Sequence, residues 1–212
     1  MPGMSRIAGP TLARERALQR AGHGPVAGVD EVGRGPLAGP VVAAAVILDP
    51  ARPIAGVDDS KALKAAQRDA LFEAIMGEAL AVAVASCSVA EIERLNIRGA
   101  SLTAMARALA GLALAPAHAL IDGRDRPPGW ETRATAVIGG DGVCLSIAAA
   151  SIVAKVTRDR MMAQLAQDHP AYGFDRHMGY ATAAHRAAIR AHGLSPHHRA
   201  GFGLCAEFSL AL

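Results

Sequence analysis

The chain has few aromatic residues, few lysines and no closely spaced cysteines. Phe, Trp and Tyr account for 3% of its 212 residues, which argues against a nucleic-acid surface built on extensive base stacking. The three cysteines, Cys87, Cys144 and Cys205, are widely separated and form no CxxC pair. This pattern argues against a disulfide framework and against a zinc knuckle, and it favours the reducing environment of the cytoplasm.

Long apolar runs are also missing. No uncharged apolar stretch reaches the roughly 18 residues that a membrane span requires, so we expect no association with a membrane. The N-terminal residues 1–24 carry several charged side chains and no apolar run of the length found in secretory signals, which argues against such a signal.

Apolar residues nevertheless make up 51% of the chain, and many of them are alanine. Together with a charged fraction of only 19%, this composition is typical of a globular protein with one good-sized domain. The formal net charge of +3 permits a nucleic-acid partner without requiring one. Nothing in the sequence indicates a large apolar interface, so we expect a monomer.

Hydrophobic patterning predicts an α/β layered domain. Apolar and β-branched runs predict five strands, at 26–30, 40–48, 81–87, 119–122 and 134–138. Helices are expected at 11–20, 62–80, 88–95, 97–114, 147–169 and 182–192. Ser88 and Glu91 have the spacing of a capping box, and Gly193 stands where a helix would stop.

Acidic residues follow three of the predicted strands. Asp30 and Glu31 end the first strand, Asp122 closes the fourth, and Asp141 comes shortly after the fifth. If these strands are neighbours, the carboxylates converge, and their repulsion would require a hard cation such as Mg²⁺ or Mn²⁺. A pair of such ions suits phosphodiester hydrolysis. Alternatively, Asp122 and Asp141 are only turn residues, since each lies beside glycine.

One segment resolves much of this ambiguity. Residues 28–41, GVDEVGRGPLAGPV, closely resemble the signature of the bacterial ribonuclease HII family, the type 2 ribonucleases H. Further matching blocks follow in order at 59–61, 95–97, 120–123, 140–141, 146–159, 169–174, 179–182 and 198–199. The resemblance spans about residues 25 to 205, and so many blocks in order are far more specific than any one of them.

The resemblance implies an RNase H-like fold, a mixed five-stranded sheet flanked by helices, with a helical C-terminal part. On this basis residues 1–24 would form a leader containing the first helix, and residues 25–212 one catalytic domain. The implied activity is endonucleolytic cleavage of RNA hybridised to DNA and incision at single ribonucleotides embedded in duplex DNA. The cut would fall 5′ of the ribonucleotide and leave 3′-hydroxyl and 5′-phosphate ends, as ribonucleotide excision repair in the cytoplasm requires.

The resemblance also assigns the metal site. Asp30, Glu31, Asp122 and Asp141 would be the catalytic set that holds two Mg²⁺ or Mn²⁺ ions, with Asp30 bridging them and Asp141 holding the hydrolytic ion. Two rivals remain at this point. A general metal nuclease would lack ribonucleotide selectivity, and a hybrid-binding protein would have lost catalysis, although the intact acidic set argues against the second.

Residues for substrate recognition follow from the same resemblance. Gly33, Arg34 and Gly35 match the family turn whose backbone reaches the ribose 2′-hydroxyl, the group that separates RNA from DNA. The alternative is a plain hairpin turn. Tyr180 matches the family tyrosine that packs on the sugar at the RNA–DNA junction, whereas Tyr172, the other tyrosine, is expected in the core.

Two lysines are candidate phosphate contacts, Lys61 and Lys155, because that role needs charge rather than a planar fork. For Lys155 a place on the helix surface is an equal alternative. Asp159 lies four residues further on and is interpreted as its structural ion-pair partner.

Several positions depart from the family pattern or offer alternatives. Gly139 stands where relatives often carry a charged residue. This departure puts in doubt whether a neighbouring side chain supports Asp141. Asp125 is an alternative fourth metal ligand. His197 and His198 are adjacent on a polar loop, and we expect them to be solvent-exposed rather than metal-bound. Residues 200–202 lack the usual serine before phenylalanine, which puts the role of that segment in doubt.

Overall fold

Five strands form one mixed sheet in the computed structural model, which describes residues 9–58, 60 and 63–209. The strands are β1 (Val26–Val32), β2 (Val41–Ile47), β3 (Ala81–Cys87), β4 (His118–Asp122) and β5 (Ala134–Val137). Their order across the sheet is β3-β2-β1-β4-β5, antiparallel from β3 to β1 and parallel from β1 to β5. The predicted mixed five-stranded sheet is therefore confirmed.

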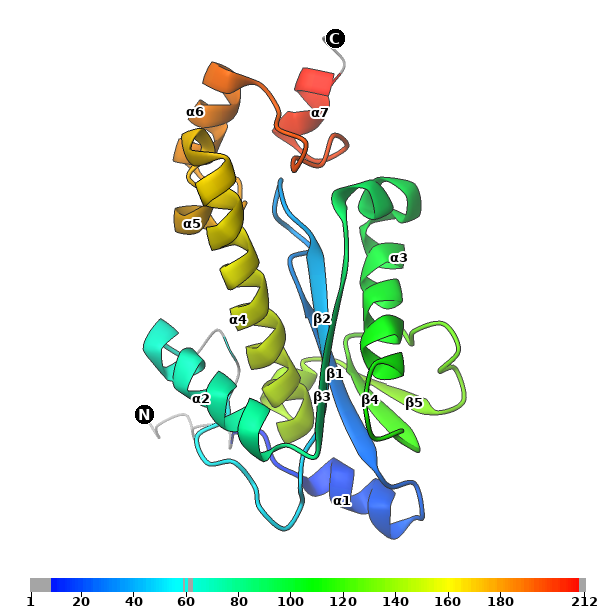
Figure 1. Ribbon diagram of the computed structural model, residues 1–212. Coiled ribbons are helices and arrows are strands. Elements are labelled where there is room, and N and C mark those ends of the chain that lie inside the picture. The colour runs from blue at the N-terminus through cyan, green and yellow to red at the C-terminus, as the bar shows by residue number, and fades with distance from the viewer. Residues whose placement is uncertain (1–8, 59, 61–62, 210–212) are drawn as a thin grey trace, which may run out of the picture.

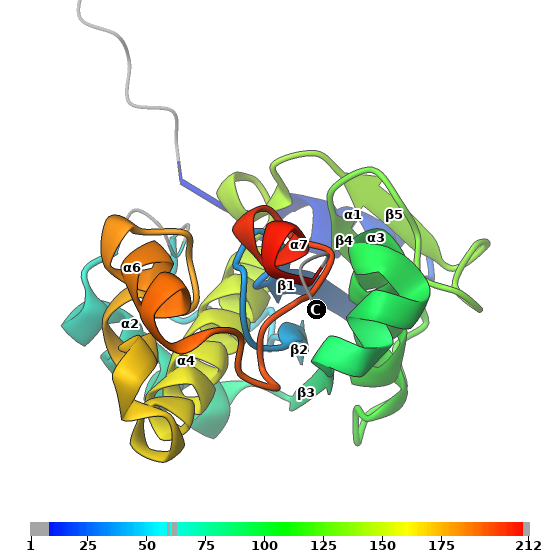
Figure 2. The same ribbon diagram turned by 90° about the horizontal axis from the view of Figure 1, so that it is seen from above.

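Helices cover both faces of the sheet (Figures 1 and 2). The helices are α1 (Ala13–Arg20), α2 (Ala65–Glu78), α3 (Val89–Ala110), α4 (Leu145–Asp168), α5 (Phe174–His177), α6 (Ala183–His192) and α7 (Leu204–Ser209), with 3₁₀ turns η1 (Gly140–Gly142) and η2 (Pro170–Tyr172). The long helix α4 packs on β1 and β2, with α2 against it, while α3 packs on the opposite face. Of the residues described, none belongs to a helix long and apolar enough to cross a bilayer.

Strand β2, between β1 and β3, is buried on both faces, which explains its unbroken apolar sequence. Ala43 and Ala45 pack toward α3, while Ala44 and Val46 pack toward α4 and α2. On neighbouring β1, a β-carbon at Gly28 would overlap the backbone of Ser146. Because glycine permits this close approach, the first turn of α4 lies directly against β1.

Some predicted boundaries differ from the observed ones. The helices expected at 88–95 and 97–114 are joined into α3, with a kink at Asn96, whose φ is 56° and ψ 169°. The capping box is confirmed, since Glu91 N donates to Ser88 Oγ at 3.3 Å and Ser88 N donates to Glu91 Oε2 at 2.9 Å. The strand expected to reach residue 138 ends at Val137, so the following segment is a loop.

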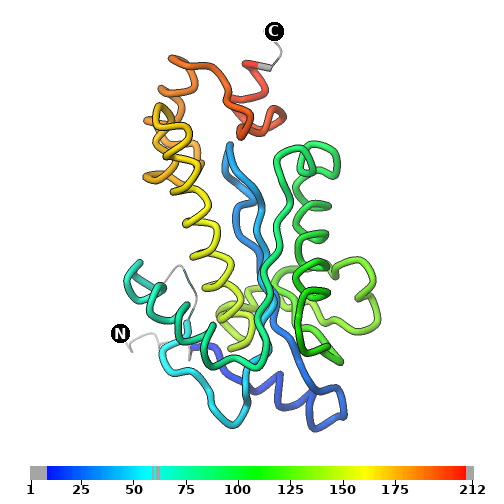
Figure 3. Tube along the Cα trace, in the orientation of Figure 1, coloured from blue at the N-terminus to red at the C-terminus, as the bar shows by residue number. Residues whose placement is uncertain are grey.

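The C-terminal part is helical, as predicted, and lies beyond the β1–β2 connection (Figure 3). Leu37 N in this connection donates to Gly179 O at 2.8 Å, and Arg199 N donates to Leu37 O at 2.8 Å. Ala38 and His198 also form an isolated antiparallel bridge. Residues 33–40 are therefore hydrogen-bonded to two separate C-terminal segments.

The buried side chain of Glu15 in helix α1 is hydrogen-bonded to the first turn of α4. Glu15 is 2% exposed, and its Oε1 accepts hydrogen bonds from Ser146 N at 2.9 Å and Ser146 Oγ at 2.6 Å. Ser146 N is one of the amide groups that a helix leaves unpaired at its N-terminus, where negative charge is favourable. The division into a leader at 1–24 and a domain at 25–212 stays a prediction.

Replacing Glu15 is expected to destabilise the protein. Glu15→Ala removes two buried hydrogen bonds, which should lower the free energy of unfolding by about 2 kcal/mol. Urea unfolding would measure this change. The exposed Glu73, paired with Arg160 at 3.2 Å, offers a matched control, because Glu73→Ala should change stability by less than about 0.5 kcal/mol. Equal effects of the two substitutions would contradict the anchoring role.

Candidate active site

Three of the four predicted acidic residues lie at one edge of the sheet. Asp30 and Glu31 occupy the end of β1, and Asp122 is the last residue of β4. Because β1 and β4 are parallel, with Val29 opposite Ile121, the register places Asp30 beside Asp122. All three side chains line one cavity of about 280 Å³. Its other lining residues are Val32, Ser60, Arg68, Ser151, Lys155 and Tyr180.

Asp30 is the most deeply placed of these carboxylates, with 5% of its surface exposed. Burial raises its pKa well above the ordinary value, and the negative charges of Glu31 and Asp122 raise it further. Hydrogen bonds from the Ser151 hydroxyl and from the backbone N–H of Glu31 partly oppose this shift in pKa. A bound cation would relieve both the burial cost and the repulsion.

Glu31 has one engaged oxygen and one open oxygen. Arg34 Nη1 donates to Glu31 Oε1 at 3.0 Å, whereas Oε2 is buried and has no hydrogen-bond partner among the described residues. Burial raises the pKa of Glu31, and the hydrogen bond and charge of Arg34 lower it in part. An open carboxylate oxygen beside two further carboxylates is a suitable ligand for a hard cation.

Asp141 follows β5, as its place in the sequence predicts, but lies in a turn apart from the other three acids. It lies in η1 and is 8% exposed, and its Oδ1 accepts a hydrogen bond from Gly142 N at 3.0 Å. It does not line the cavity that the other three acids share. Its neighbour Gly140, however, donates its N–H to Asp122 Oδ1 at 2.7 Å. The turn carrying Asp141 is therefore attached to the acidic cluster, and its role as a ligand stays a prediction.

The donor set fits a divalent cation that is completed by other ligands. Across residues 9–58, 60 and 63–209, no group of three or more His, Cys, Asp or Glu side chains is arranged to hold an ion by itself. Mg²⁺ typically keeps several waters and binds one or two carboxylates together with substrate phosphates. The open oxygen of Glu31 and the raised pKa of Asp30 match such a partial site.

The predicted glycine turn lies next to the acids. Gly33 has a φ of 95°, a conformation that a residue with a side chain rarely adopts. Arg34 is exposed and paired with Glu31. A β-carbon at Gly35 would lie 3.9 Å from a ring carbon of Tyr180, which is itself 44% exposed. The structure thus brings the turn and Tyr180 together at the edge of the acidic cavity.

The two candidate lysines have different outcomes. Lys155 lines the cavity, and its Nζ pairs with Asp159 Oδ1 at 2.7 Å, as the i, i+4 spacing predicts. Lys61 lies outside the described residues. Arg68 also lines the cavity and was missed, because nothing in the sequence of α2 distinguishes it from a surface arginine. Its Nη1 donates to Leu63 O at 2.6 Å.

Two serines were also missed as cavity residues. Ser60 Oγ and Ser151 Oγ share a hydrogen bond of 2.8 Å, and Ser151 in turn contacts Asp30. Both lie inside sequence blocks that carried the family resemblance, at 59–61 and 146–159. Their position within those blocks was the available signal, since serine alone predicts no particular role.

The alternative ligands are otherwise engaged. Both carboxylate oxygens of Asp125 accept hydrogen bonds from Arg98, at 2.8 and 2.7 Å. The expectation that His198 is solvent-exposed is wrong, since it is only 4% exposed. Ser195 N and Oγ bind His198 Nδ1 at 2.9 and 2.8 Å, and His198 Nε2 lies 3.0 Å from His185 Nε2. This histidine pair is part of the C-terminal core.

The buried histidine pair predicts acid sensitivity. Burial, followed by the neighbouring His185, lowers the pKa of His198 from 6.5 to about 4. Between pH 6.5 and about 4 the folded protein therefore binds fewer protons than the unfolded chain. The contribution of His198 to the free energy of unfolding is complete above pH 6.5 and is lost as the pH falls toward about 4. We expect a loss on the order of 3 kcal/mol in the free energy of unfolding, measurable by thermal melting. His198→Gln should flatten this dependence, and an unchanged slope would contradict the assignment.

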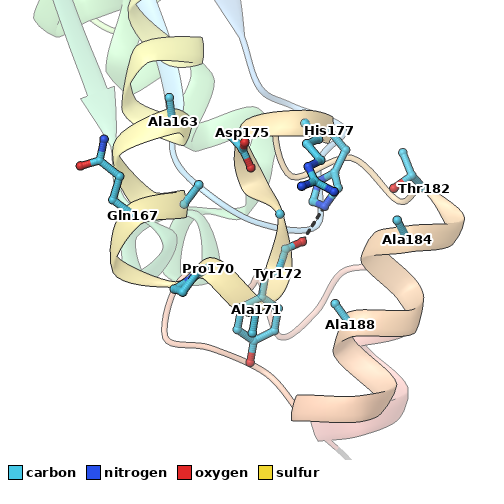
Figure 4. Close-up of a pocket in the computed structure, with 13 residues that line it drawn as sticks. Ala163, Gln167, Pro170, Ala171, Tyr172, Asp175, His177, Thr182, Ala184 and Ala188 are labelled. Carbon is cyan, nitrogen blue, oxygen red and sulfur yellow. Dashed lines mark hydrogen bonds between the residues drawn. The ribbon is translucent and has the colours of Figure 1, made fainter.

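A second, wider groove lies away from the acidic cluster. It has a volume of about 780 Å³ and runs between the end of α4, η2, α5 and α6 (Figure 4). Tyr172 lines it, and the Tyr172 hydroxyl donates to Gly193 O at 3.1 Å while its ring stacks on Phe174. Tyr172 is half-buried in this C-terminal packing, as expected of a structural tyrosine. None of the predicted site residues that the structure describes lines this groove.

Comparison with known proteins identifies the family. The family profile described as ribonuclease HII matches residues 27–205. The chain belongs to the ribonuclease HII family. A ribonuclease HII of Nitrobacter hamburgensis is 58% identical over 201 residues, which cover 95% of this chain and 74% of the relative. A ribonuclease HII of Burkholderia thailandensis is 60% identical over 177 residues, covering 84% and 82% respectively.

Solved structures support the same assignment. The crystal structure of ribonuclease H2 from Pyrococcus horikoshii matches with a TM-score of 0.73 and 26% identity, covering 88% of this chain and 97% of that one. Ribonuclease HII proteins are hydrolases of the ribonuclease H class. This chain is therefore a metal-dependent endoribonuclease that acts on RNA–DNA hybrids.

Proposed function

We propose that the protein, besides cutting the RNA strand of RNA–DNA hybrids, incises duplex DNA 5′ of single embedded ribonucleotides and leaves 3′-hydroxyl and 5′-phosphate ends. One observation carries this proposal. The glycine turn and Tyr180 meet at the mouth of the cavity that Asp30, Glu31 and Asp122 line. Groups suited to recognising a sugar therefore lie beside groups suited to holding cations.

Asp30, Glu31, Asp122 and Asp141 would hold two divalent cations, either Mg²⁺ or Mn²⁺. When bound, such a pair activates a water nucleophile and stabilises the leaving oxygen. The chain itself orients the ligands. Ser151 hydrogen-bonds Asp30, and Gly140 N donates to Asp122 Oδ1, so both carboxylates are held in place.

Substrate selection would depend on the sugar rather than on the base. The backbone of Gly33, Arg34 and Gly35 lacks bulky side chains at its two glycines and can approach a 2′-hydroxyl closely. Tyr180 offers an exposed ring at the adjacent position, suited to packing on a deoxyribose. Lys155 would contact a phosphate of the substrate, and Lys61, which lies outside the described residues, is proposed for the same role from its sequence.

A cleavage assay with three duplexes tests the proposal. The duplexes carry one ribonucleotide, no ribonucleotide, or a uniform RNA strand, each incubated with Mg²⁺, with Mn²⁺ and with chelator. We expect metal-dependent cutting of the first and third only, with 3′-hydroxyl products at the single ribonucleotide. Cutting of the all-DNA duplex at an equal rate would instead indicate a general metal nuclease.

A monomer in the cytoplasm completes the proposal. Cys87, Cys144 and Cys205 are all buried, as suits a reducing environment. Sedimentation at micromolar concentration would test the monomeric state, and a dimer would contradict it.

A further inference from the structure

Two arginine side chains are fully buried next to the glycine turn. Arg158 in α4 and Arg199 beyond α6 are each 0% exposed. Within the described part of the chain neither forms an ion pair with a carboxylate, and all their hydrogen bonds go to backbone carbonyl oxygens. Burying a charge without a counter-ion is costly, so this arrangement requires an explanation.

Arg199 holds the turn that is predicted to read the ribose. Its Nη2 donates to Gly33 O at 2.6 Å and to Gly39 O at 2.8 Å. Its Nη1 donates to Arg34 O at 3.0 Å, and its Nε to Gly39 O at 3.0 Å. One planar guanidinium therefore fixes both ends of the segment from 33 to 39.

Arg158 joins the same segment to the segment that carries Tyr180. Its Nε donates to Pro40 O at 3.0 Å and its Nη2 to Ala38 O at 3.1 Å. Its Nη1 donates to Met178 O at 3.0 Å, two residues before Tyr180. Arg158 thus bridges the two elements that are proposed to contact neighbouring sugars.

The glycine turn packs closely against Arg158. A β-carbon at Gly33 would overlap Arg158 Nε, so this glycine lies flat against the guanidinium. A β-carbon at Gly179 would lie 2.5 Å from Ala38 O, so the two backbone segments also touch directly. Burial and the nearby Arg158 lower the pKa of Arg199 to about 9, which still leaves it charged at neutral pH.

We infer that Arg158 and Arg199 are positioning residues that set the spacing between the glycine turn and Tyr180, and thereby the preference for a ribonucleotide followed by a deoxyribonucleotide. This inference rests on the proposed function. Both residues act through the backbone that they hold, without contact to the reacting atoms. The planar fork is required because a single ammonium cannot hold three carbonyl groups at fixed separations.

Lysine substitutions test this inference while keeping the charge. For Arg199→Lys and Arg158→Lys we expect kcat/KM on the single-ribonucleotide duplex to fall at least about tenfold, and on the uniform hybrid by less than about threefold. The uniform hybrid has a ribose at the position that Tyr180 would contact, so it depends less on the spacing. Arg160→Lys is the matched control, since Arg160 is an exposed arginine of the same helix, and both rates should stay unchanged.

The ratio of the two rates, measured on the same protein preparation, distinguishes positioning from folding. Equal losses on both substrates, or no loss on either, would overturn the inference, because a merely structural role predicts no change in preference. Thermal melting identifies any variant that fails to fold, and the other lysine variant then decides. If the wild-type protein cuts the single-ribonucleotide and all-DNA duplexes equally, the proposed function itself fails and the inference fails with it.

Discussion

Asp30→Asn is expected to abolish cleavage while making the protein more stable. Asp30 lies at the centre of the acidic cluster, so its loss should lower kcat on an RNA–DNA hybrid by at least about a hundredfold. The raised pKa of Asp30 means that the folded protein loses stability as pH rises from 3.8 through that pKa. Asparagine keeps the shape of the side chain without the charge and should therefore raise the melting temperature at pH 7.

Three measurements check this prediction together. Hybrid binding should remain detectable in the variant, and added Mg²⁺ or Mn²⁺ should raise the melting temperature of the wild type more than that of the variant. Asp175→Asn offers a matched control, because Asp175 lines the distant groove of Figure 4. Cleavage by Asp30→Asn at the wild-type rate would refute the assignment of this residue.

The second large effect is expected at Asp141. Asp141→Asn should lower kcat by at least about a hundredfold if this residue is the fourth ligand. Asp125→Asn should change kcat by less than about threefold, because Arg98 already occupies both oxygens of this 38% exposed side chain. Steady-state rates on a uniform hybrid would measure both variants under one set of conditions.

Comparing the two variants decides whether Asp141 or Asp125 is the fourth metal ligand. Loss of activity in Asp125→Asn alone would identify Asp125 as the ligand and show that the Arg98 pair opens when substrate binds. Near-normal rates in both variants would leave the three cavity-lining acids as the complete set. Circular dichroism controls for folding, since Asp141 caps the N–H of Gly142 in its own turn.

The positions of the cavity-lining acids could be predicted because strand ends are visible in the sequence. An apolar run followed by acids, as at Asp30 and Asp122, indicates both where a strand ends and what it presents there. The parallel pairing of β1 and β4 then brings the two residues together. The mixed sheet and the metal set, by contrast, depended on the family resemblance rather than on periodicity.

The buried polar contacts could not be predicted. Nothing local distinguishes Arg158 from the exposed Arg160, although one is fully buried and the other is paired at the surface. His198 was misjudged for the same reason, because its burial results from packing between segments that lie far apart in the chain. Hydrogen bonds between a side chain and a backbone segment distant in the chain produce no periodic pattern in the sequence, so they cannot be predicted from it.

The parallel pairing of β1 with β4 has a consequence for synthesis of the protein. The antiparallel strands β1, β2 and β3 are close in sequence and can pair early, but Asp30 and Asp122 are about 90 residues apart. During translation, a half-made chain would carry the first two acids without the third and without α4. Phosphodiester cleavage would therefore begin only after β4 and α4 have left the ribosome and packed against β1.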